Sequence, residues 1–169
     1  YIIFTADHGL SCGHHGLLGK QNMFDHSMRV PLMVVGKGVE AGAKIDTPVY
    51  LQDIMPTTLE LAGSSIPDHV KFKSLLPVLS KQKNQQYDAI YGAYTATQRM
   101  ITDDGFKLTL YPKVPKMLLF DMQNDPSEQN DLSEVAVNQT RIKAMFKKLQ
   151  SLQVETGDTL DLGGAFPEL

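Results

Sequence analysis

The side chains best suited to chemistry gather near the start of the chain. Asp7 and His8 stand side by side at the end of the apolar run 2–6. Four of the five histidines lie between residues 8 and 26, and Lys20 stands in the same stretch. A carboxylate and a neutral imidazole can bind a divalent cation, and an ammonium nearby can hold an anionic group as a point charge. The stretch therefore predicts a site for a metal ion and an anion.

The elements around these residues would place them at the edge of a sheet. A short apolar run that ends at a Gly is typical of a buried, parallel strand, which we expect over residues 1–6. In open α/β sheets, ligands bind beyond the carboxyl ends of the strands. Asp7 and His8 occupy that position, and Gly9 lets the chain turn sharply after them. A second apolar strand is expected over residues 31–35.

Other expected elements are a site loop over 7–29 with a helical turn near 22–28, a short strand over 49–51, a helix between Asp53 and Gly63, strands over 89–94, 98–102, 106–111 and 117–120, and a helix over 133–154. The turn Asp103-Asp104-Gly105 between two short apolar runs indicates a hairpin, and hence an antiparallel sheet. Apolar residues at helical spacing between Val137 and Leu152 predict that the last helix packs on this sheet.

Composition excludes several classes of protein. The chain has 169 residues, of which 42% are hydrophobic and 21% charged, as in an ordinary globular domain. A net charge of −3 argues against a nucleic-acid surface, and no apolar run approaches the roughly 20 residues of a membrane span. The single cysteine rules out a disulfide framework. The chain opens inside an apolar run with no basic segment before it, so we expect a fragment of a longer protein.

Several segments, in this order, resemble the second half of a type I sulfatase, of the alkaline-phosphatase-like superfamily. They are Phe4-Thr5-Ala6-Asp7-His8-Gly9, His15-Gly16-Leu17-Leu18-Gly19-Lys20 and Arg29-Val30-Pro31-Leu32, followed by the stretches 52–63 and 119–132. The resemblance implies that Asp7 and His8 are two ligands of one divalent cation. That ion is Ca²⁺ in most sulfatases. Mn²⁺ and Zn²⁺ are alternatives because an imidazole suits a transition metal better, and Mg²⁺ is a further alternative.

The resemblance also implies roles for Lys20 and His15. Lys20 would contact the sulfate and offset charge that develops on the transferred group. His15 would line the pocket, orient Lys20 or touch the substrate. Each residue also has a plain structural interpretation: Asp7 and His8 as a loop pair, Lys20 as a surface lysine, and His15 as a hydrogen-bonded loop histidine.

The family's nucleophile, a formylglycine, is expected in a missing N-terminal part. Its motif is Cys or Ser followed by x-Pro-x-Arg. Cys12 is not that nucleophile, because His14 and Gly16 stand where the motif needs Pro and Arg. The fragment alone is therefore expected to be inactive, and its partner would be the missing N-terminal half of the catalytic domain.

The fold class that the resemblance implies is α/β. Residues 1–86 would form part of a mainly parallel alkaline-phosphatase-like sheet with helices. Residues 87–169 would form a small antiparallel sheet packed with a C-terminal helix, and the polar stretch 81–86 marks the boundary. The family would place the protein in a periplasmic, secreted or lysosome-like compartment, with the signal region outside this chain.

Three functions are compatible with these residues. The first is a sulfatase that acts on a small-molecule or saccharide sulfate ester. The second is a phosphodiester or phosphonate monoester hydrolase of the same superfamily, whose loop would look nearly the same. The third is a non-catalytic module that binds a metal or a sulfated glycan.

Overall fold

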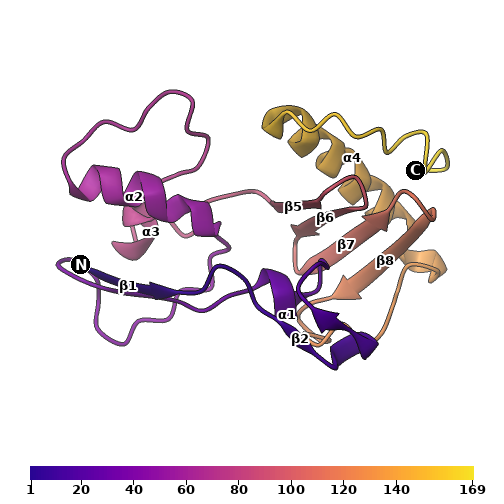
Figure 1. Ribbon diagram of the computed structural model, residues 1–169, viewed down its shortest axis with the longest axis horizontal. Helices are drawn as coiled ribbons and strands as arrows, with labels where there is room; N and C mark the ends of the chain where they lie inside the picture. Colours follow the sequence, from indigo (N-terminus) through magenta and orange to yellow (C-terminus); the bar gives the residue numbers. More distant parts are fainter. The chain divides into compact units, whose positions relative to one another are not determined.

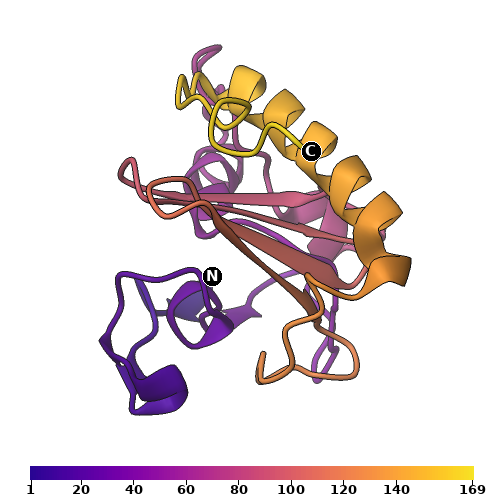
Figure 2. The ribbon, with the colours of Figure 1, turned by 90° about the vertical axis from the view of Figure 1, so that its right-hand side faces the viewer.

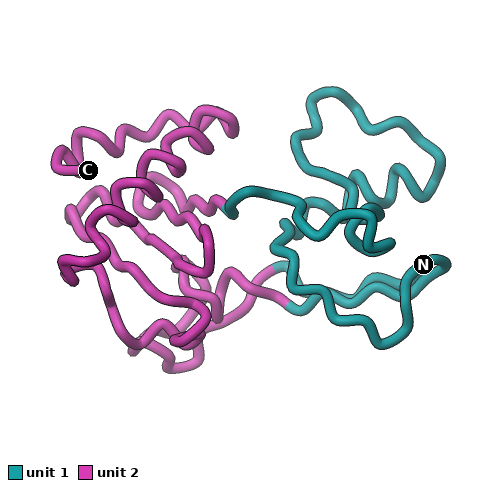
Figure 3. The backbone as a smooth tube through the Cα atoms, turned by 180° about the vertical axis from the view of Figure 1, so that it is seen from behind, with its two compact units in different colours: residues 1–7, 31–90 teal, residues 8–30, 91–169 magenta.

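A computed structural model describes residues 1–169 without a gap. The chain forms two compact units, which consist of residues 1–7 with 31–90, and of residues 8–30 with 91–169 (Figure 3). The site loop therefore belongs to the same unit as the C-terminal sheet. The expected domain boundary between residues 86 and 87 stays a prediction.

The first unit contains a two-stranded ribbon (Figure 1). Strand β1 (Ile2–Thr5) pairs with β4 (Leu32–Val35), and the two strands run antiparallel. The parallel pairing expected for the first strand is therefore not formed between strands of this chain, because an apolar run does not by itself tell parallel from antiparallel pairing. One face of the ribbon is apolar and exposed; its side chains are Ile2 (70% exposed), Phe4 (58%), Met33 (56%) and Val35 (65%).

A buried aspartate organises the helices of the first unit. Asp53 is wholly buried and accepts hydrogen bonds from the backbone N–H groups of Tyr50 and Lys73, each at 3.0 Å. It ends a 3₁₀ turn (Leu51–Asp53), which replaces the short strand expected there, and α2 (Ile54–Leu61) follows. A short helix, α3 (Leu76–Leu79), completes the unit. The expected helix between Asp53 and Gly63 is therefore confirmed.

The second unit is built on a four-stranded antiparallel sheet. Its strands follow one another in chain order: β5 (Ile90–Tyr94), β6 (Gln98–Asp103), β7 (Phe106–Tyr111) and β8 (Lys116–Asp121). Helix α4 (Gln139–Thr156) lies across one face of this sheet (Figure 2). The predicted α/β fold class, with an antiparallel sheet and a C-terminal helix, is confirmed.

The core of this unit lies between α4 and the sheet. Its fully buried side chains include Ile101, Leu108, Leu110, Leu119, Ile142 and Leu149. Apolar residues at helical spacing supply the helix side of that core. The helix begins at Gln139, six positions later than expected, because a 3₁₀ turn (Ala136–Asn138) precedes it and the Asn138 amide donates to the carbonyl of Leu132 at 3.2 Å.

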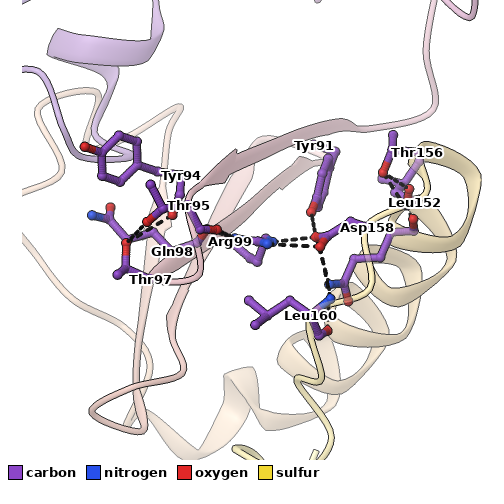
Figure 4. Close-up of polar contacts among 11 residues, drawn as sticks. Tyr91, Tyr94, Thr95, Thr97, Gln98, Arg99, Leu152, Thr156, Asp158 and Leu160 are labelled. Atoms are coloured by element: carbon purple, nitrogen blue, oxygen red, sulfur yellow. Dashed lines mark hydrogen bonds and ion pairs between the residues drawn. The ribbon is translucent and has the colours of Figure 1, made fainter.

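A polar network ties the segment after α4 to the sheet (Figure 4). Arg99 on β6 donates to Asp158 through Nε and, at 3.0 Å, through Nη2. The Tyr91 hydroxyl and the backbone N–H of Leu160 also donate to Asp158. The Arg99 guanidinium holds the pKa of this carboxyl well below its usual range. The network thus fixes the C-terminal tail.

None of the helices has the length and apolar character needed to cross a membrane.

Candidate functional site

The site loop has a small framework of its own. Strands β2 (Ser11–Cys12) and β3 (Leu18–Gly19) pair antiparallel around a 3₁₀ turn (His14–Gly16). The buried Ser11 hydroxyl lies 2.9 Å from the carbonyl oxygens of both His14 and Leu17, and so closes the turn. Helix α1 (Asp25–Met28) follows, where a helical turn was predicted.

This framework brings His8 and Lys20 together. The Lys20 ammonium contacts Nε2 of His8. Nδ1 of His8 lies 2.8 Å from the carbonyl oxygen of Gly9, which can only accept a hydrogen bond. Nδ1 therefore carries the proton, and Nε2 keeps the lone pair toward which the ammonium points. A hydrogen bond from the other ring nitrogen to a carbonyl commonly fixes the tautomer of a metal-binding histidine.

Gly9 anchors this pair to α1. Its N–H donates to the carbonyl of Ser27 at 2.9 Å. A Cβ atom at this position would collide with the carbonyl of His26. Gly9 is therefore required for close approach of two backbone segments, and not only for the turn that the sequence suggested.

His15 lies in an aromatic cluster. Its backbone is left-handed (φ 55°), and its ring stacks on Phe24 with centroids 4.0 Å apart and 9° between planes. The His26 ring lies 5.8 Å from that of His15 and 6.0 Å from that of His14. Burial lowers the pKa of His26, and the neighbouring His15 and His14 lower it further. The cluster orients His15; its catalytic role stays a prediction.

Asp7 belongs to the other compact unit. It is exposed and stands at the end of β1, at an open hollow of about 430 Å³. The other residues around that hollow are Thr5, Ala6, Leu51, Gln52, Ile54 and Met55. Its predicted role as a metal ligand stays a prediction.

The donor set of this chain is partial. Residues 1–169 hold no group of three or more His, Cys, Asp or Glu side chains that could bind a metal ion. Asp7 offers a carboxylate and His8 an imidazole lone pair, both suitable for a divalent cation. Ca²⁺ takes roughly six to eight oxygen ligands, so most of its coordination shell would have to come from elsewhere.

The sequence did not reveal the buried ion cluster beneath α1. Lys107 on β7 contacts Asp25 and donates to Glu128 at 2.8 Å. Its side chain is only 1% exposed. A lysine within the otherwise apolar strand 106–111 was the available signal, because a charged side chain in a buried strand needs partners.

Comparisons with known proteins identify the family of the chain. Residues 13–155 match the family model described as N-sulphoglucosamine sulphohydrolase, C-terminal. Arylsulfatase K of Xenopus laevis is 29% identical over 90% of this chain and 31% of its own length. The chain thus spans about a third of this relative.

Solved structures of related hydrolases resemble this chain. One of them, a complex with its substrate D-glucosamine-2-N,6-O-disulfate, has a TM-score of 0.85 and 26% identity and covers 93% of this chain and 34% of its own. The phosphonate monoester hydrolase of Agrobacterium radiobacter has a TM-score of 0.77, also at 26% identity, with 90% and 34% covered. The predicted resemblance to the C-terminal portion of a sulfatase is therefore confirmed: the chain belongs to the sulfatase family and matches its C-terminal region.

Proposed function

We propose that this chain is the C-terminal portion of an enzyme that hydrolyses sulfate esters, with a formylglycine nucleophile outside residues 1–169. The observation that carries the proposal is the contact between Lys20 and Nε2 of His8 just after β1. A chain of the sulfatase family thus presents an ammonium and an oriented imidazole on one loop. That pair suits an anionic ester held beside a cation.

Asp7 and His8 are the proposed metal ligands. His8 fits this role because its Nδ1–H is engaged with the Gly9 carbonyl, which leaves the Nε2 lone pair for a cation. That single lone pair cannot serve both a cation and Lys20. A cation held by Nε2 would therefore leave the Lys20 ammonium available to the anion. The bound cation, for which Ca²⁺ is the first candidate, would supply positive charge to the sulfate oxygens.

Lys20 is the proposed electrostatic catalyst on this chain. Its ammonium would lie where negative charge grows on the sulfate and on the leaving oxygen, and so would lower the barrier. His15 is the proposed helper. Its ring is already oriented by stacking on Phe24, so it can present one nitrogen to substrate without first losing rotational freedom.

A sulfated saccharide is the proposed substrate class. One of the similar structures is a complex with a glucosamine disulfate, which supports a saccharide sulfate over a simple alkyl sulfate. The second candidate function is hydrolysis of phosphonate monoesters. It is favoured by the likeness to a phosphonate monoester hydrolase, at a TM-score of 0.77.

Paired esters test the proposal. The whole protein that carries this chain is assayed on an aryl sulfate, a glucosamine sulfate and an aryl phosphonate monoester. We expect sulfate release to be the fastest reaction and to stop when a chelator removes divalent metal. Preferential phosphonate hydrolysis would support the second candidate, and turnover of none of the three would contradict both.

Variants link that activity to this chain. Lys20→Met should lower kcat/KM for the sulfate ester by about 10²–10³-fold, the usual cost of losing one group that stabilises developing charge. Lys44→Met is the matched control, since Lys44 is also an exposed lysine but lies outside the loop. Equal effects of the two variants would count against the role of Lys20.

A further inference from the structure

A buried ion cluster joins the site loop to the C-terminal sheet. Lys107 lies on β7, and its ammonium contacts Asp25 and lies 2.8 Å from Oε1 of Glu128. The ammonium also donates to the carbonyl of Met23 at 3.2 Å. Lys107 and Glu128 are only 1% and 3% exposed. A single lysine thus binds three points on two segments that lie far from it in sequence.

The cluster holds the beginning of α1. Oε2 of Glu128 accepts the backbone N–H of Asp25 at 2.6 Å, while Oε1 faces Lys107. Asp25 is the first residue of α1, where backbone N–H groups have no partner inside the helix. The two oxygens of Glu128 therefore connect the helix terminus to the strand. The Lys107 ammonium offsets the negative charge of the Glu128 carboxylate.

From α1 the connection continues to the candidate site. The carbonyl of Ser27 accepts the N–H of Gly9, directly after His8. Phe24, which precedes Asp25, carries the stacked ring of His15. Both arms of the site loop thus rest on the short helix that the cluster holds.

Two features indicate that the cluster contributes to position more than to stability. Buried ion pairs are weak sources of stability, because desolvation offsets most of the attraction. Glu128 also has a left-handed backbone (φ 55°), which costs free energy for a residue with a side chain. The arrangement is thus charged and strained, and its clear structural effect is to fix α1 against β7.

We propose that Lys107, Asp25 and Glu128 are positioning residues, which hold α1 so that Gly9 sets the place of His8 beside Lys20. They touch neither the substrate nor the cation. The inference rests on the proposed function for its catalytic readout, but the order of the loop can be measured without any activity.

Matched variants of the whole protein test it. Lys107→Met removes the central cation, and Glu128→Gln keeps the size of the side chain while removing its charge. Arg99→Met is the control, because Arg99 is also buried, stands on the neighbouring strand β6 and has a carboxylate partner, Asp158. The ion pair of Arg99 holds the C-terminal tail (Figure 4), and the Arg99 guanidinium itself donates to Asp158, Thr95 and Gln98, none of which lies within residues 8–30.

Two readouts separate positioning from general destabilisation. Amide hydrogen exchange over residues 8–30 should speed up in Lys107→Met and Glu128→Gln and stay unchanged in Arg99→Met. The alkylation rate of the exposed Cys12, followed by peptide mass spectrometry, should change in the same two variants. kcat for the sulfate ester should fall about 10–100-fold in those variants, the usual loss when a supporting group is removed, and by less than about threefold in the control.

Two results would overturn the inference. One is unchanged exchange of the loop in folded Glu128→Gln. The other is an equal loss of kcat in Lys107→Met and Arg99→Met at equal melting temperature. If the wild-type protein hydrolyses no sulfate ester, the proposed function fails, whereas the exchange comparison still decides the positioning role.

Discussion

His8 shows how one backbone contact can prepare a side chain for chemistry. The carbonyl of Gly9 selects the tautomer in which Nδ1 holds the proton, so that Nε2 presents its lone pair to Lys20. His8 and Lys20 are twelve positions apart on one loop and contact each other; their roles in a site stay predictions.

Glu128 allows backbone strain to be separated from charge. Glu128→Gly removes the carboxylate and relieves the left-handed backbone, whereas Glu128→Ala removes the carboxylate alone. We expect Glu128→Gly to be more stable than Glu128→Ala by about 1 kcal/mol, a typical cost of this backbone conformation. Chemical denaturation of both variants measures the difference. Equal stabilities would show that the strain is relieved in solution.

His26 predicts a dependence of stability on pH. Its folded pKa lies below the ordinary 6.5 because burial and two neighbouring histidines disfavour the charged ring. As the pH falls below 6.5, His26 becomes protonated in the unfolded chain while it is still neutral in the folded protein. The free energy of unfolding should therefore fall between pH 7 and pH 5, and His26→Gln should flatten that fall.

The control for this prediction is His69→Gln, since His69 is exposed. Melting temperatures recorded across the pH range for the three proteins suffice. A fall of the same size in wild type and His26→Gln would assign the pH dependence to other groups.

Among the elements, the segment that follows α4 is held to the sheet by an ion pair. The tie between Arg99 on β6 and Asp158 holds the segment that follows the helix, as Figure 4 shows. Asp158→Asn leaves the buried guanidinium without a charged partner. We expect this variant to lose about 3 kcal/mol of stability, in line with other broken buried pairs. Urea denaturation measures the loss.

Tyr91→Phe is the matched change in the same network. It removes one hydrogen bond to Asp158 but keeps the ion pair, so it should cost only about 1 kcal/mol. A loss as large as that of Asp158→Asn would mean that the hydroxyl, and not the ion pair, holds the tail.

How far the sequence predicts the elements depends on the range of the forces that form them. The antiparallel sheet and α4 follow from local patterns, such as the Asp103-Asp104-Gly105 turn. The antiparallel pairing of β1 with β4 could not be predicted, because it depends on strands far apart in the chain. The ion cluster is the clearest example: Lys107 stands 82 positions from Asp25 and 21 from Glu128, and no local pattern joins them.

At the scale of the whole molecule, the chain supplies only part of a site. It spans about a third of the relatives that it matches, and its metal donors are fewer than a cation needs. The exposed apolar face of the β1–β4 ribbon, formed by Ile2, Phe4, Met33 and Val35, would suit a contact with the remaining part of the protein.

We therefore expect residues 1–169 alone to release no sulfate from an aryl sulfate. The formylglycine motif is expected outside this range, and without a nucleophile Lys20 and His8 cannot break the ester bond. The whole protein, assayed at the same concentration and metal content, is the control. Turnover by the purified short chain, after contaminants are excluded, would show that the nucleophile lies within it.

The most direct measurement is a crystal structure of the whole protein with a divalent cation and a sulfated ligand. We predict that Nε2 of His8 and the Asp7 carboxylate both lie about 2.0–2.6 Å from the cation. Lys20 should have left His8 to contact the sulfate. A cation bound away from Asp7 and His8, or a Lys20 still on His8 with the sulfate in place, would contradict it.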